Sequence, residues 1–226
     1  MKAEAQALGM TKTTYADTSG FSDRTVSTLQ DQMVLAWEAM KNPVFAQIVA
    51  MPSVRLPGIG VVNSTNQALG QDGIVGIKTG FTEEAGGNLV FAAQREINGQ
   101  RVLLIGGALG QVDRPAAFEA SRRLVVAASQ GLEVARVVTA GQPVATLKPK
   151  WQDAVELVAA EDVSMLLWPG SSLQATVEYN EIEAPLAQGA AVGSLILKLG
   201  EQERRVPIVL SEPLPSAGIA WRLTRL

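Results

Sequence analysis

The residues of this chain best suited to chemistry on a peptide stand together at Lys78-Thr79-Gly80. A cation and a hydroxyl on one strand can hold a substrate carboxylate. The glycine lets a peptide backbone lie against the strand edge as an added strand. Taken alone, the triplet also fits a lysine that ends a strand before a Thr-Gly turn, so the surrounding sequence has to decide between the two.

The absence of histidine and cysteine from the 226 residues limits the chemistry further. It excludes Ser-His-Asp and Cys-His relays, disulfides, and imidazole or thiolate metal sites. General acid–base catalysis would therefore use Lys, Asp, Glu or Tyr, and the nucleophile would be Ser or Thr. No carboxylates show EF-hand-like spacing, so we expect neither a metal nor a cofactor.

The composition is that of a folded protein with a core, because 47% of the residues are hydrophobic and 18% are charged. The net charge of −3 and the lack of a basic stripe argue against nucleic acid as the main partner. No apolar run approaches the ~20 residues that span a bilayer.

The first half of the chain alternates predicted helices and strands. Residues 1–8 form a helix pattern that Gly9 would end, and Ser27 with Gln30 makes a capping box before a second helix. The apolar face of that second helix comprises Leu29, Met33, Ala36, Trp37 and Met40. A short helix is predicted from Pro43, with apolar residues Phe45, Ile48 and Val49, and residues 52–60 are predicted to be a loop.

A sheet is predicted to follow from Ile74. Residues 88–95 and 101–108 are apolar runs joined across Asn98-Gly99, a strong hairpin signal because both residues tolerate positive φ. Asp113 can cap a helix that has Pro115 in its first turn and ends at Gly131. Its predicted apolar face comprises Phe118, Leu124, Val125 and Ala128.

After Gly131 the sequence contains only short strand candidates separated by Gly and Pro, which is typical of a small β-sandwich. The candidates are residues 134–138, 144–147, 154–159, 163–168, 173–179, 192–199 and 206–210. The predicted fold class is therefore α/β, an antiparallel sheet with helices, followed by an all-β sandwich. We place the first domain at residues 1–130, the second at 131–212, and the start of an amphipathic membrane anchor at 213–226.

The wider sequence resembles the serine-type D-alanyl-D-alanine carboxypeptidases, the low-molecular-mass penicillin-binding proteins of peptidase family S11. The similarity runs through MKAEAQALGMTKTT (1–14), Gly20, residues 63–69 and DGIVGIKTGFTEEAGGN (72–88). In the second half, residues 159–163, 175–177 and 184–195 resemble the β-rich domain that follows the catalytic domain, and 216–226 resembles the start of a C-terminal anchor.

The resemblance implies a penicillin-binding-protein or β-lactamase-like domain in which a serine attacks a peptidoglycan stem peptide ending in D-Ala-D-Ala. Lys78 and Thr79 would bind the substrate carboxylate, and the backbone N–H of Phe81 would donate to the oxyanion. Arg114 is a candidate second carboxylate contact, although the family position can also align with Ala116. β-Lactam antibiotics as ligands, and an extracytoplasmic or periplasmic site at the membrane, are implied for the full-length protein.

Two family motifs are absent. No serine here begins a Ser-x-x-Lys motif, and Ser64-Thr65-Asn66, the one Ser-x-Asn match, stands where the family has an Asn-x-Asn segment, so we interpret it as a chance match. We therefore expect the C-terminal portion of a longer enzyme, without its nucleophile and inactive alone. With the nucleophile helix and N-terminal strands missing, the sheet is expected to have one uncovered apolar face and an open edge.

The alternative is a non-catalytic module that keeps the K-T-G groove and the β-domain to bind cell-wall peptide or protein. A class A β-lactamase explains less, because it leaves the β-domain unaccounted for. At the C-terminus, Trp221, Leu223 and Leu226 with Arg222 and Arg225 fit either an interfacial helix or a docked end of the chain.

Overall fold

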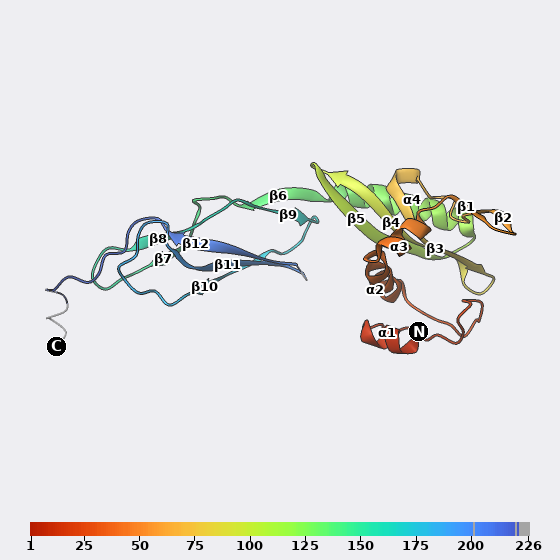
Figure 1. Ribbon diagram of the computed structural model, residues 1–226, viewed down its shortest axis with the longest axis horizontal. Coiled ribbons are helices and arrows are strands. Elements are labelled where there is room, and N and C mark those ends of the chain that lie inside the picture. Colours follow the sequence, from red (N-terminus) through yellow and green to blue (C-terminus); the bar gives the residue numbers. More distant parts are fainter. Residues whose placement is uncertain (201, 220, 222–226) are drawn as a thin grey trace. The chain divides into compact units, whose positions relative to one another are not determined.

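The computed structural model describes residues 1–200, 202–219 and 221. The chain forms two compact units, Met1–Gly131 and Leu132–Leu226 (Figure 1).

The first unit contains four α-helices: α1 (Lys2–Ala7), α2 (Leu29–Met40), α3 (Pro43–Val49) and α4 (Arg114–Gly131). Its strands are β1 (Ser53–Leu56), β2 (Gly60–Asn63), β3 (Ile74–Thr82), β4 (Gly86–Ile97) and β5 (Gln100–Gln111), with a 3-10 turn, η1 (Gln71–Gly73), before β3. Strands β3, β4 and β5 form an antiparallel sheet in that order, and β1 pairs with β2.

The predicted hairpin is confirmed. Strands β4 and β5 meet at Asn98 and Gly99, whose φ values of 49° and 79° lie in the left-handed region. Two positive-φ residues match the twist of the flanking strands, which is why Asn-Gly suits this turn.

Helices pack against both faces of the sheet (Figure 1). Leu89, Phe91 and Ala93 of β4 share a buried core with residues of α4. On the opposite face, Val90 lines a cavity with residues of α2, and a Cβ built on Gly107 would lie 2.9 Å from Leu29 Cδ1. The expectation of one uncovered face is therefore wrong, since α2 contacts β4 and β5 and α3 contacts β3. Among the described residues, β3 and β5 remain unpaired along their outer edges.

Three local expectations need correction. Thr28, not Ser27, caps α2 by accepting from Asp31 N, because the Ser27 hydroxyl is engaged with Thr13 and Gln32. Residues 52–60 are not a plain loop, because they contain β1, the turn around Gly58 (φ 75°) and the start of β2. Trp37 of α2 and Leu124 of α4 are about half exposed (55% and 48%), so neither belongs to the core.

The second unit is built from all seven predicted strands. They are β6 (Glu133–Val138), β7 (Pro143–Leu147), β8 (Val155–Ala159), β9 (Val163–Leu167), β10 (Gln174–Tyr179), β11 (Ala191–Leu199) and β12 (Gln202–Leu210). One sheet has the order β10-β11-β12-β8-β7, and β6 pairs with β9. Val138 of β6 and Met165 of β9 join the core of the larger sheet, so the two sheets pack face to face as in a sandwich.

The C-terminal segment packs on this unit as far as it is described. The Trp221 ring stacks edge-on against Trp151 at 5.6 Å, and its Nε1 donates to the Lys150 carbonyl. Residues 220 and 222–226 of the predicted anchor, which include Arg222, Leu223, Arg225 and Leu226, lie outside the described residues. Within the part that is described, no helix is both long and apolar enough to cross a membrane.

Candidate functional site

The K-T-G residues lie on β3, an edge strand. Lys78, Thr79 and Gly80 pair on one side with Val90, Leu89 and Asn88 of β4. On the other side no strand pairs with β3 among the described residues. An edge strand directs alternate N–H and C=O groups outward, so this edge can receive a further extended chain.

Lys78 brings a cation to this edge. Its side chain is exposed, and its Nζ donates to the Thr79 carbonyl. No carboxylate in the described part of the chain forms an ion pair with it. The ammonium has three donors, so it can still bind an incoming anion.

Gly80 is not required by the fold. A Cβ built there would meet only Asn88 Cβ, at an ordinary 3.8 Å. Gly87, on the neighbouring strand, is the opposite case, because its Cβ would lie 1.8 Å from the Asp113 carbonyl oxygen. Gly87 thus lets the start of α4 approach the sheet, whereas Gly80 leaves open space beside the edge.

Asp72, which lies just before β3, anchors the start of this strand. Its carboxylate forms an ion pair with Arg122 of α4 at 2.7 Å, and its carbonyl accepts from Arg95 Nη1 at 3.3 Å. Gly73 (φ 81°) follows, and a Cβ there would lie 2.3 Å from the Gln94 carbonyl oxygen. These contacts fix where the strand leaves the turn and thereby where Lys78 emerges.

Arg114 lies near the other end of β3. Its guanidinium is 5.5 Å from the centre of the Phe81 ring, within the range of a cation–π contact. The structure therefore brings two of the predicted residues together and places a second cation beside the strand. Arg114 is exposed at the start of α4, where the Asp113 carboxylate caps the helix by accepting from Ala116 N at 2.7 Å.

A cavity of about 630 Å³ adjoins this end of the strand. It is lined by Phe21, Ser22 and Asp23 of one loop, and by the end of β3 with the turn after it: Phe81, Thr82, Glu83 and Glu84. Asp17 organises the loop that carries Phe21, since its carboxylate accepts from Ser19, from Thr25 and from the Phe21 N–H. The hydrogen bonds from Ser19 and Thr25 hold the pKa of Asp17 well below its usual range.

Sequence reasoning missed Thr65. Its hydroxyl lies 2.8 Å from the Thr79 hydroxyl, so the segment that we interpreted as a chance Ser-x-Asn match contacts the K-T-G strand. No sequence signal places two residues fourteen positions apart side by side, because this contact depends on the turn between them.

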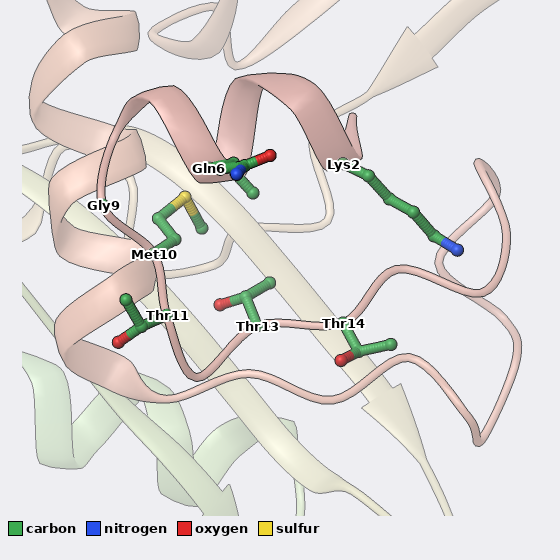
Figure 2. A pocket seen from close by; sticks show the side chains of 8 residues that line it. Lys2, Gln6, Gly9, Met10, Thr11, Thr13 and Thr14 are labelled. Carbon is green, nitrogen blue, oxygen red and sulfur yellow. The ribbon is translucent and has the colours of Figure 1, made fainter.

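Another cavity, of about 390 Å³, lies beside α1. Figure 2 shows Lys2 and Gln6 on that helix, and Gly9, Met10 and three threonines on the segment after it. It shares no lining residue with β3, and we assign it no chemistry. The described residues contain no group of three or more acidic side chains arranged to hold a metal ion.

Comparison with known proteins relates both parts of the chain to one class of enzyme. The D-alanyl-D-alanine carboxypeptidase family model of peptidase S11 matches residues 1–106, and the model for the C-terminal domain of penicillin-binding protein 5 matches residues 133–215. This chain is an S11 carboxypeptidase-like protein. The K-T-G strand falls within the first match, and strands β6 to β12 fall within the second.

Similar curated proteins bear carboxypeptidase names. This S11-like chain is 26% identical to D-alanyl-D-alanine carboxypeptidase DacF of Bacillus subtilis over 238 residues, covering the whole chain and 60% of DacF. It is 38% identical to D-alanyl-D-alanine carboxypeptidase DacB2 of Mycobacterium tuberculosis over 111 residues, covering 46% of the chain and 38% of DacB2. The chain thus spans less than two thirds of either relative.

Solved structures share the fold of the S11-like chain. Penicillin-binding protein 5 of Haemophilus influenzae matches with a TM-score of 0.58 at 20% identity, over 95% of this chain and 64% of that one. A peptidoglycan synthesis regulatory factor (PBP3) of Streptococcus pneumoniae matches with a TM-score of 0.60 at 21% identity, over 94% and 67%. These neighbours support the fold class predicted from the sequence: helices on an antiparallel sheet, followed by a β-rich domain.

Proposed function

We propose that this chain is the substrate-binding part of a D-alanyl-D-alanine carboxypeptidase and holds a stem peptide ending in D-Ala-D-Ala along β3. The observation that carries the proposal is the edge at Lys78–Gly80, where an exposed ammonium without a carboxylate partner among the described residues stands near a glycine that the fold does not need. A peptide backbone would add to the edge, and its terminal carboxylate would lie at Lys78 Nζ and the Thr79 hydroxyl.

Phe81 and Arg114 complete the proposed site. The Phe81 backbone N–H would donate to the oxyanion of the attacked carbonyl, and Arg114 would add positive charge near the peptide's carboxylate. In the full-length enzyme the same surface would receive β-lactams, and acyl transfer would need a serine nucleophile from a Ser-x-x-Lys motif. Because this sequence has no such motif, we propose that the chain alone binds peptide without hydrolysing it.

A peptide-binding titration tests the proposal. An Nα-acylated peptide ending in D-Ala-D-Ala should bind the chain, and Lys78→Met should weaken binding about 10- to 100-fold, because a charge-assisted hydrogen bond to the carboxylate is lost. Lys2→Met, which removes an exposed lysine from α1, serves as the matched control and should change nothing. Equal binding of the L-Ala-L-Ala peptide, or no effect of Lys78→Met, would contradict the proposal.

A second candidate function, a non-catalytic module that binds cell-wall peptide, is favoured by the absence of Ser-x-x-Lys. Fluorescent penicillin separates catalysis from binding. We expect no covalent labelling of this chain, and labelling would show that another serine acts as the nucleophile. The proposed location is extracytoplasmic, where stem peptides occur, with membrane attachment through the C-terminus of the full-length protein.

A further inference from the structure

The segment Ser64–Asn66 lies against the K-T-G strand at a single polar contact. Thr65 Oγ1 and Thr79 Oγ1 are 2.8 Å apart, a normal distance for a hydrogen bond between hydroxyls. Each hydroxyl has one proton to donate and two lone pairs to accept. Either one can therefore be the donor in the structure as it stands.

Thr65 is held in place by hydrogen bonds on both sides of it. Ser64 N donates to the Pro52 carbonyl at 2.8 Å, and Asn66 N donates to Ser64 Oγ at 3.2 Å. The buried Asn66 side chain accepts from Ala68 N at 3.1 Å. Such side-chain to backbone bonds fix a turn locally, so the exposed Thr65 hydroxyl is presented to Thr79 by a preorganised segment.

A carboxylate bound at Thr79 would decide the direction of the Thr65–Thr79 bond. A carboxylate can only accept hydrogen bonds, so Thr79 must give its single proton to it. Thr79 then has no proton left for Thr65, and Thr65 must become the donor. The result is a chain that runs from the Thr65 O–H to Thr79 Oγ1, and from the Thr79 O–H to the carboxylate.

We infer that Thr65 is a positioning residue for carboxylate recognition at Thr79. This inference rests on the proposed function, because it assumes that a peptide carboxylate reaches β3. Thr65 acts in two ways. It fixes the rotamer of the Thr79 hydroxyl, and, by donating to Thr79 Oγ1, it polarises the Thr79 O–H toward the anion. The polarised O–H favours a terminal carboxylate over a neutral terminal amide, because a hydrogen bond to a charged acceptor is the stronger one.

The experiment measures binding of two peptides that differ only at the end, D-Ala-D-Ala with a free carboxylate and its carboxamide. Thr65→Val keeps the shape of the side chain and removes the hydroxyl, whereas Thr65→Ser keeps the hydroxyl. We expect Thr65→Val to weaken binding of the acid about three- to tenfold, the usual weight of one hydrogen bond, and to leave the amide within about twofold. Thr65→Ser, which keeps the hydroxyl, should bind the acid about as tightly as the wild type does.

Two further variants keep the result interpretable. Thr11→Val alters an exposed threonine whose hydroxyl makes no hydrogen bond among the described residues, and it should leave both peptides unaffected. In a Thr79→Val background, Thr65→Val should have no further effect, because a residue that acts through Thr79 loses its influence once that hydroxyl is gone.

The outcomes separate this inference from the function it rests on. If Thr65→Val weakens acid and amide alike, or if its effect adds to that of Thr79→Val, Thr65 only supports the loop and the inference is overturned. If the acid binds in a Lys78-dependent way but ignores Thr65→Val, the inference fails and the proposed function stands. If the chain does not bind the acid, or binds it regardless of Lys78, the proposed function fails and the inference fails with it.

Discussion

At the scale of single residues, a substitution at Gly80 separates a requirement of folding from a requirement of ligand binding. We expect Gly80→Ala to change the free energy of unfolding by less than about 0.5 kcal/mol, because the new Cβ meets only Asn88 Cβ at 3.8 Å. The same methyl projects from the edge strand and should weaken binding of a D-Ala-D-Ala peptide about tenfold or more, since it keeps the peptide backbone away from β3. Urea unfolding and peptide titration measure the two effects.

Gly87→Ala is the matched comparison. Its Cβ would lie 1.8 Å from the Asp113 carbonyl oxygen, so the start of α4 would have to move, and we expect destabilisation of about 1–3 kcal/mol. If Gly80→Ala proved as destabilising as Gly87→Ala, the glycine of the K-T-G triplet would be a requirement of folding. Its presence would then say nothing about a ligand.

Sequence reasoning reached Lys78–Gly80 but missed Thr65, and the reason is physical. A cation, a hydroxyl and a glycine in a row are visible in the sequence and have a shared chemical use. The Thr65–Thr79 contact forms only after η1 and its flanking turns bring residues 14 positions apart together. Arg114 was predictable only in part. Asp113 and Pro115 predict the helix start on which it lies. Its contact with the Phe81 ring, however, depends on how closely Gly87 lets α4 approach the sheet.

At the scale of helices and strands, an element was predictable from the sequence where one or two neighbouring residues specify its start or its turn. Asn98-Gly99 specified its turn by backbone preference alone, and Asn42 and Pro43 specified the start of α3, where Asn42 Oδ1 accepts from Val44 N at 2.9 Å. The β1–β2 hairpin was missed although Ser53–Leu56 alternates polar and apolar residues, because four residues are a short pattern and the flanking Pro52, Pro57, Gly58 and Gly60 are typical of a loop.

Asp31 joins two elements and allows a prediction at that scale. Its buried carboxylate, in the first turn of α2, accepts from Lys12 N at 2.9 Å and from the Thr13 hydroxyl at 2.6 Å. Asp31→Ala would leave both donors without this acceptor, at a cost of about 1–3 kcal/mol. We expect the segment after α1 to detach from α2, seen as faster hydrogen exchange at the Lys12 amide.

Asp31→Asn is the control for this prediction, since its side-chain oxygen can still accept from Lys12 N. It should retain more amide protection than Asp31→Ala. Equal protection of the Lys12 amide in the wild type and in Asp31→Ala would show that other contacts hold the segment to the helix.

At the scale of the whole molecule, the two units differ in how completely they cover their apolar residues. The core of the second unit joins twelve buried apolar residues from strands and loops, whereas the cluster between α4 and the sheet joins eight. The first unit also exposes Phe21, Ile48 and Ile59, at 82%, 59% and 74%. Because burial of apolar surface is the main stabilising term, the first unit should be the less stable one.

We therefore expect the chain to unfold in two steps in urea, with the first unit unfolding before the second. The helices α1 to α4 all lie in the first unit, so far-UV circular dichroism follows mainly its unfolding. Of the four tryptophans, only Trp37 belongs to the first unit, and it is half exposed, so Trp37→Phe should cost little. Fluorescence of that variant then reports on the second unit through Trp151, Trp168 and Trp221, and its midpoint should lie at higher urea than the loss of helix. Coincident midpoints would contradict the prediction that the first unit is the less stable one.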